Sequence, residues 1–303
     1  MKARNLTKSE LEKLIADEVN IYADTRVIVK ASMAERIFVK RVSCSKLHPN
    51  PDDEFSDPKI GPNYQIVSSY VQAIKHAELH GDEPWLDDPV IVEKSFPDGY
   101  LLLNGHHRWA ACRMYGKKRI RTKIVNLTQQ QDIEKMLKST DYSKRAALDL
   151  EEVVFSDNED LCEKPLKFLS GFSYKERLRL GIPALFRYLS SEGYDIWVYS
   201  NEYYSFDYLR HLFGKYHAGV TGVITGVGRK TKSFKETRLQ REKLFESKYS
   251  ETLHISIDNI VRTKRSGEEP EVYDIKDTDK GWYREAVDIV KGMTDPLPDD
   301  KKE

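Results

Sequence analysis

The stretch Leu101-Leu-Leu-Asn-Gly-His-His-Arg-Trp-Ala-Ala111 decides the fold of the first half of the chain. The leucines predict a strand, and the residues from His106 to Gly116 predict a helix that begins directly after an Asn-Gly turn. Backbone N–H groups at the start of a helix have no partner inside it and point outward, so such a turn attracts anions. Gly105 would let the backbone approach the anion closely.

The side chains of this turn favour a phosphate ligand. His107 and Arg108 add donors at the helix start, and an arginine binds phosphate oxygens in bidentate fashion. We therefore expect the turn to bind the phosphates of a nucleotide through five consecutive residues: Asn104, Gly105, His106, His107 and Arg108. The alternative is an ordinary strand–turn–helix whose histidine and arginine side chains are solvated.

The surrounding sequence predicts a compact α+β domain over residues 1–128. A Pro- and Asp-rich loop over residues 48–63 separates short strands from a helix over residues 65–77. The remaining predicted elements are a helix over residues 7–20 and strands over residues 26–30, 36–42, 89–93, 100–103 and 120–127.

The order of these elements resembles the nucleotide-binding domain of the ParB/sulfiredoxin superfamily. The segment Gly105-His-His-Arg108 is similar to the Gly-x-His-Arg element of that superfamily, and Leu47-His-Pro-Asn-Pro51 is similar to its early loop. Sulfiredoxins have a nucleophilic cysteine where this chain has His106, so the departure disfavours sulfinic acid repair. The string Asn-Gly-His-His-Arg-Trp-Ala looks most like the branch that contains free serine kinases.

That resemblance implies a phosphotransferase with ATP or ADP as the phosphoryl donor and a small hydroxyl compound, such as free serine, as the acceptor. Glu54 or Asp53, shortly after the early loop, would be the general base, and His107 would neutralise charge on the moving group. Lys59 and Ser68 would contact phosphate as well, with Ser69 as the alternative to Ser68. Two alternatives stay open: a solvated acidic turn at residues 52–54, and a non-catalytic nucleotide-binding switch of the ParB type that controls association with protein or DNA.

The second half of the chain follows a different pattern. Strands alternate with helices from Ala146 onward, which predicts an α/β domain over residues 146–293 with a parallel sheet covered on both faces. Residues 129–145 are polar and are expected to form a connector, and residues 294–303 a disordered tail.

Acidic residues end the first strand of this domain. The run Leu148-Asp-Leu-Glu151 resembles the first motif of haloacid dehalogenase (HAD)-like hydrolases, whose Rossmannoid fold carries an attacking aspartate. By that resemblance Asp149 would be the nucleophile, and Asp149, Glu151 and Asp258 would hold Mg²⁺. Phosphate would be bound by Ser200, Asn201 and a lysine, Lys230 or Lys232.

Two departures from the HAD pattern leave the activity of this domain open. Glu151 replaces the usual second aspartate, and its extra methylene displaces the carboxyl group of a proton donor. Asn259 follows Asp258, where many relatives carry another acid. The domain is either an HAD-type phosphatase or a degenerate copy retained for packing, docking or ligand sensing.

The composition limits the remaining classes. The chain has 303 residues, with 49 Lys+Arg against 49 Asp+Glu, and this balance disfavours binding dominated by nucleic-acid phosphates. Three scattered cysteines do not make a disulfide scaffold or a paired zinc motif. No run approaches the ~18 apolar residues of a membrane span. We therefore expect a cytoplasmic protein whose partners are a nucleotide and a small hydroxyl compound, not a membrane.

Overall fold

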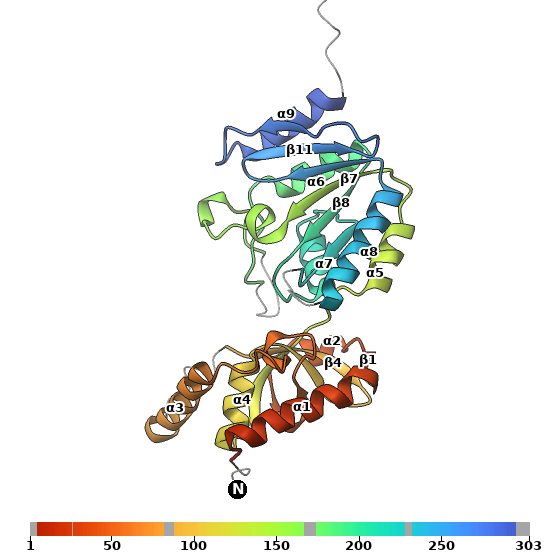
Figure 1. Cartoon of the computed structure of the whole chain (residues 1–303). Helices are drawn as coiled ribbons and strands as arrows, with labels where there is room; N and C mark the ends of the chain where they lie inside the picture. The colour runs from red at the N-terminus through yellow and green to blue at the C-terminus, as the bar shows by residue number, and fades with distance from the viewer. Residues whose placement is uncertain (1–4, 26, 82–87, 167–173, 228–231, 295–303) are drawn as a thin grey trace, which may run out of the picture. The chain divides into compact units, whose positions relative to one another are not determined.

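The computed structural model describes residues 5–25, 27–81, 88–166, 174–227 and 232–294. The chain forms two compact units: the residues up to Asn126 belong to the first, and most residues from Leu127 onward belong to the second (Figure 1). Among the described residues, no helix combines the length and the apolar character that crossing a bilayer requires.

The first unit is built on a mixed sheet with the strand order β2-β6-β4-β5-β3, and β1 pairs with β4. Parallel pairs (β4 with β6, β3 with β5) alternate with antiparallel pairs, as expected for an α+β domain. The strands are β1 (Val27–Ile28), β2 (Lys40–Ser43), β3 (Leu47–His48), β4 (Val90–Phe96), β5 (Tyr100–Asn104) and β6 (Arg119–Ile124).

Three long helices accompany this sheet, and a fourth is a single turn. They are α1 (Lys8–Thr25), α2 (Met33–Arg36), α3 (Tyr64–His80) and α4 (His106–Tyr115). The core joins residues of α1, α3 and α4 to the sheet, and Trp109 of α4 lies in it with 1% of its surface exposed. The Trp109 indole N–H donates to the carbonyl oxygen of Cys44 at 2.9 Å, which fixes α4 against the segment after β2.

One predicted strand is wrong in its first half. The β-branched run over residues 36–42 predicts a strand, but α2 ends at Arg36 and β2 begins only at Lys40. The Glu35 carboxylate accepts the Ser32 backbone N–H at 2.8 Å, which is the capping-box contact that starts a helix. Local capping therefore overrides the strand propensity of the residues that follow.

The second unit contains a mostly parallel sheet with the strand order β12-β11-β10-β7-β8-β9. The four strands from β10 to β9 are parallel, while β11 and β12 are antiparallel additions at one edge. The strands are β7 (Lys144–Asp149), β8 (Tyr194–Tyr199), β9 (Gly222–Ile224), β10 (Glu251–Ile255), β11 (Asn259–Lys264) and β12 (Glu271–Asp274).

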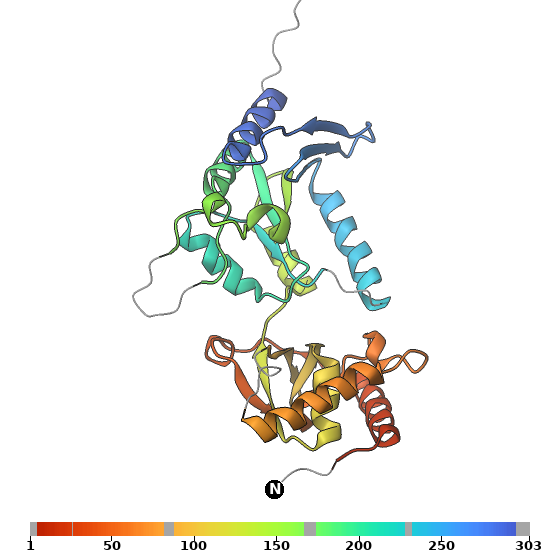
Figure 2. The same cartoon turned by 90° about the vertical axis from the view of Figure 1, so that its left-hand side faces the viewer.

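Helices cover both faces of this sheet, as the alternating pattern predicts (Figure 2). Successive side chains of β8 lie on opposite faces of the sheet: Ile196 and Val198 belong to one buried cluster, and Trp197 belongs to another. The first cluster includes residues of α6 (Ile182–Ser191), α7 (Phe206–Lys215) and α9 (Trp282–Thr294), and the second includes residues of α5 (Gln130–Lys138) and α8 (Lys232–Lys248).

The segment that we expected to connect the domains belongs to the second unit. Within residues 129–145, Ile133, Met136 and Leu137 of α5 are buried in the cluster around Trp197. The apolar spacing of these three residues is the sequence signal that marks this helix as packed, although most of its neighbours are polar.

Candidate functional site

The turn between β5 and α4 has the geometry of an anion-binding helix start. Gly105 adopts a left-handed conformation with φ of 93°, and a Cβ atom there would lie 2.6 Å from Cγ1 of Val90. The first backbone bond of the helix runs from the Trp109 N–H to the Gly105 carbonyl oxygen at 2.9 Å. The N–H groups of residues 106–108 precede that bond, so the helix itself does not use them.

His106 lies inside the fold and fixes the loop before it. Its Nε2 accepts the Asn50 backbone N–H at 3.3 Å, and its Nδ1 lies 3.8 Å from Oδ2 of Asp53. Burial lowers the pKa of His106 to about 4, although the Asp53 carboxylate partly opposes this. The ring is therefore neutral near pH 7 with its proton on Nδ1, because Nε2 acts as an acceptor. The side chain of His106 therefore positions this loop, while its backbone N–H, which the sequence predicts to bind phosphate, precedes the first backbone bond of α4.

His107 faces a different segment. Its Nε2 accepts the backbone N–H of Asn63, the N-cap residue of α3, at 3.1 Å. Burial lowers the pKa of this half-buried histidine too, so it is neutral at pH 7 with its proton on Nδ1. The Nδ1–H is then the side-chain donor that His107 can offer to a ligand.

Phe55 brings the acidic turn beside this helix start. Its ring centroid lies 5.3 Å from that of His106 and 5.2 Å from that of His107. Asp53 caps the short turn Glu54–Ser56 by accepting the Phe55 N–H at 2.9 Å, and Glu54 next to it is exposed. The packing therefore gathers the predicted acids and the predicted anion turn in one region.

The Arg108 side chain contacts Asp88 and Asn104 of its own chain. Its side chain is 8% exposed, and NH1 forms an ion pair with Asp88 at 2.7 Å and a hydrogen bond with the Asp88 carbonyl oxygen. NH2 donates to Oδ1 of Asn104 at 3.2 Å. The guanidinium thus ties the turn to the segment before β4, and these donors are already engaged. Arg108 is a residue that holds the turn in place.

Two further predicted phosphate contacts, Lys59 and Ser68, lie on the surface. Within the described part of the chain neither forms a hydrogen bond with residues 104–108. The residues that sequence reasoning missed are Asn50, Asn63 and Asp88. Asn63 carried a local signal, since an asparagine before an apolar helical stripe is a typical N-cap, and Asn50 lies in the Leu47–Pro51 loop on which the resemblance rests.

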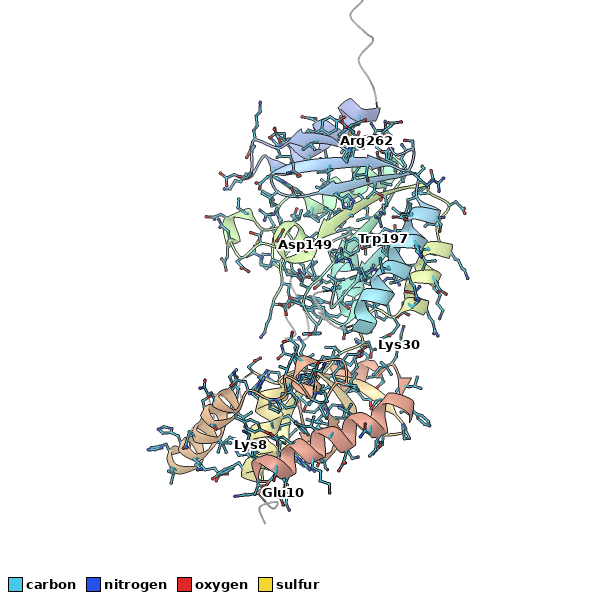
Figure 3. All side chains as sticks on the ribbon, in the orientation of Figure 1. Lys8, Glu10, Lys30, Asp149, Trp197 and Arg262 are labelled. Carbon is cyan, nitrogen blue, oxygen red and sulfur yellow. The ribbon has the colours of Figure 1, made fainter. Side chains whose placement is uncertain are left out.

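The second predicted site lies at the carboxyl edge of the parallel strands. Asp149 ends β7 and is labelled in Figure 3, and Ser200 directly follows β8. Oδ1 of Asp149 accepts the Glu152 N–H at 2.9 Å, which caps a single wide turn over Leu150–Val154. That turn carries Glu151 toward β8.

The Glu151 carboxylate accepts hydrogen bonds from the groups that were predicted to bind phosphate. Its Oε1 accepts the Ser200 hydroxyl at 2.5 Å, and its Oε2 accepts the Asn201 backbone N–H at 3.1 Å. Burial raises the pKa of the Glu151 carboxyl, and these two hydrogen bonds only partly offset that effect. The structure therefore brings Glu151, Ser200 and Asn201 together, with the carboxylate where a phosphate was expected.

The predicted magnesium ligands contact different groups in the structure. Among the described residues, no three His, Cys, Asp or Glu side chains gather closely enough to hold a metal ion. Glu151 faces Ser200, and Asp258 is exposed after β10. Lys230 lies outside the described residues, and Lys232 is the first residue of α8.

Comparison with known families supports the interpretation of the first unit. Residues 29–140 match the family model of the ParB N-terminal domain, so the chain carries an α+β ParB-like domain in its first half. The match ends before β7, the first strand of the second sheet. A search of curated proteins finds no match for this chain.

Proposed function

We propose that the first unit binds a nucleoside diphosphate or triphosphate at the start of α4 and transfers a phosphoryl group to a small hydroxyl compound, with free serine as the first candidate. One observation carries this proposal: Gly105 leaves the helix start uncapped by a side chain, while His106 and His107 lock two loops around it. The ParB-like family match supports nucleotide binding and leaves the transfer step as our proposal.

The donors at this site suit a phosphate chain. The backbone N–H groups of residues 106–108 and the N-terminal end of the helix dipole attract negative charge. The His107 Nδ1–H adds a neutral donor, because Nε2 is engaged by Asn63. Since Arg108 is paired with Asp88, we assign the binding of phosphate to the backbone and His107.

The acidic turn supplies the base that transfer requires. Phosphoryl transfer needs a carboxylate that orients the acceptor hydroxyl and takes its proton. We assign this role to Glu54, because it is exposed on the turn that Phe55 packs against both histidines. Asp53 is less suited, since it already caps the turn and lies next to His106.

For the second unit we propose an HAD-like domain. The strand order β10-β7-β8-β9, the wide turn after Asp149 and the serine after β8 support this assignment. The hydrogen bonds of Glu151 with Ser200 and Asn201 argue against phosphatase activity in this arrangement, so we place the enzymatic activity in the first unit.

A transfer assay tests the proposal. Purified protein is incubated with γ-labelled ATP or β-labelled ADP and with serine, other amino acids, sugars and nucleosides in separate pools. We expect a phosphorylated product that Glu54→Gln reduces by about 10²–10⁴-fold without loss of nucleotide affinity, as removal of a general base does. Asp52→Asn, with the same charge change in the same loop, is the matched control and should retain activity. Saturable nucleotide binding without any product would contradict the kinase and favour the non-catalytic switch.

A further inference from the structure

Arg145 of β7 lies on the face of the second sheet that α8 covers. The central carbon of its guanidinium group lies 4.5 Å from the ring centroid of Phe245 and 5.8 Å from that of Tyr249, both on α8. Its Nε donates to the Thr252 hydroxyl at 2.9 Å, and NH1 donates to the Tyr199 hydroxyl at 3.3 Å. Two rings and two hydroxyls thus hold the guanidinium in place without neutralising its charge.

Another arginine of the same sheet shows how such a charge is ordinarily paired. Arg262 of β11, labelled in Figure 3, donates from NH2 to Glu251 at 2.8 Å and from NH1 to Glu271 at 3.4 Å. Within the described ranges, Arg145 forms no ion pair, and its NH2 has no acceptor. NH2 is also not a buried polar atom, so it faces solvent and can donate to a ligand.

The carboxylate that lies opposite Arg145 in the sheet is engaged by other groups. Asp195 of β8 is the register partner of Arg145. It accepts the hydroxyl groups of Thr140 and Tyr249, each at 2.8 Å, and that of Thr221 at 3.1 Å. Because three hydroxyl donors satisfy this carboxylate, the positive charge of Arg145 is left to an anion from outside the chain.

A second arginine reaches the same place from the helix. Arg241 lies one turn before Phe245 on α8, on the side of the helix that faces the sheet, and it is 8% exposed. Burial raises the pKa of the Tyr199 hydroxyl, and the charges of Arg145 and Arg241 both oppose that rise. Both guanidinium groups therefore lie near the Tyr199 hydroxyl.

Two positive charges beside one hydroxyl suit an anion with more than a single charge. A phosphate monoester carries about −1.5 to −2 charges at pH 7, whereas a carboxylate carries one, and a guanidinium binds phosphate oxygens in bidentate fashion. The Tyr199 hydroxyl accepts from Arg145, so its own proton is available to the ligand.

We propose that Arg145, Arg241 and the Tyr199 hydroxyl form a phosphate-binding site on the α8 face of the second sheet, which takes inorganic phosphate or the phosphate group of a small monoester. None of the three residues belongs to the strand-end set of Asp149, Glu151, Ser200 and Asn201. The inference concerns the second unit alone and does not depend on nucleotide binding at α4.

Calorimetric titration of the full chain with inorganic phosphate, glycerol 3-phosphate and acetate tests this proposal. We expect Arg145→Gln and Arg241→Gln each to weaken phosphate binding roughly 10-fold, as loss of a hydrogen bond to a charged group does. Arg238→Gln is the matched control, because Arg238 is exposed on the same helix and pairs with Glu242 at 2.8 Å, and it should bind like the wild type.

The other ligands identify the anion. Acetate should bind more weakly than phosphate, and the tighter of the two phosphate compounds tells whether the site takes free phosphate or a monoester. Phosphate that binds at α4 contributes equally to all these proteins, so failure of the first unit to bind nucleotides does not affect the comparison.

A further variant keeps the proposal testable if Arg145→Gln does not fold. Tyr199→Phe retains the ring and removes only the hydroxyl, and it should weaken phosphate binding roughly 5-fold. The proposal is overturned if the wild type binds no phosphate, if the folded variants at these three positions bind it as tightly as the wild type, if Arg238→Gln weakens binding equally, or if acetate binds as tightly as phosphate.

Discussion

At the start of α4, His106 and His107 each accept a backbone N–H from a neighbouring loop, whereas after β8, Ser200 and Asn201 each donate to the carboxylate of Glu151. Both regions follow a strand end and both present donors that suit an anion. In the first region neutral acceptors hold the surrounding loops, and no side chain caps the helix start at Gly105. In the second region the charged carboxylate of Glu151 accepts the hydrogen bonds of both donors.

Hydrogen-bond donors alone therefore do not make an available anion site. The sequence contains comparable strand-end donors in both units, and the neighbouring acceptor decides whether they are available. A neutral histidine satisfies the backbone without adding negative charge, while a carboxylate both occupies the donors and repels an incoming phosphate.

The largest effect should come from the turn of the first unit. Gly105→Ala combines a left-handed backbone with a Cβ atom 2.6 Å from Cγ1 of Val90, so we expect a loss of roughly 3–4 kcal/mol in the free energy of unfolding. Gly81→Ala is the control, because Gly81 also has a positive φ of 75° but open space around it, and it should cost only about 1 kcal/mol. Urea denaturation measures both. Equal losses would show that the turn is not closely packed.

The neutral state of His106 predicts a pH dependence. Its pKa falls from the ordinary 6.5 to about 4 in the folded protein, so the unfolded chain binds a proton in that range and the folded chain does not. Stability from this group is complete above pH 6.5 and is lost as the pH falls toward 4, by roughly 3 kcal/mol.

Hydrogen exchange of α4 between pH 7 and pH 4 measures this loss. His106→Gln keeps an acceptor but does not titrate, so its peptides should show a shallower dependence on pH. Identical pH profiles for the two proteins would refute the neutral, buried assignment.

In the second unit, Ser200→Ala removes one of two donors from a half-buried carboxylate. Hydrogen bonds to charged groups contribute roughly 1.5–3 kcal/mol, so we expect a loss of about 2 kcal/mol in the free energy of unfolding. Ser191→Ala is the control, because its exposed hydroxyl only donates to the Tyr188 carbonyl oxygen, and it should change stability by less than about 0.5 kcal/mol. A neutral Ser200→Ala would mean that Glu151 does not depend on this bond.

The smallest effect should come from the N-cap of α3. Oδ1 of Asn63 accepts the Gln65 and Ile66 N–H groups at 3.0 and 3.3 Å, while its backbone N–H donates to His107. Asn63→Ala should therefore cost about 1 kcal/mol, as lost caps do, and should keep the His107 contact. Denaturation and nucleotide titration together check this, and a large loss of affinity without a loss of stability would assign the Asn63 side chain to the ligand.

The sequence predicts local features of this molecule well. Leucines at residues 101–103 and the Asn-Gly turn place β5 and the start of α4 at the observed residues, and alternating strands and helices predict a parallel sheet covered on both faces. These features depend on residues that are close together in the sequence, within one helical turn or one strand. The pattern of residue types along the chain is therefore enough to predict them.

The partners of the site side chains could not be predicted in the same way. Arg108 pairs with Asp88, twenty residues earlier, and Glu151 bonds Ser200, forty-nine residues later. Both contacts form only when the sheets form. In both, a carboxylate of the chain lies where a phosphate ligand was expected. The buried side of α5 was missed because its three apolar residues stand among polar ones.

Calorimetric titration of the wild-type chain with ADP and ATP shows whether the start of α4 binds a nucleoside polyphosphate. We predict saturable binding that weakens at least 10-fold in His107→Ala and stays unchanged in His76→Ala, which removes an exposed histidine from α3. Absence of binding by the wild type, or equal binding by both variants, would contradict the account.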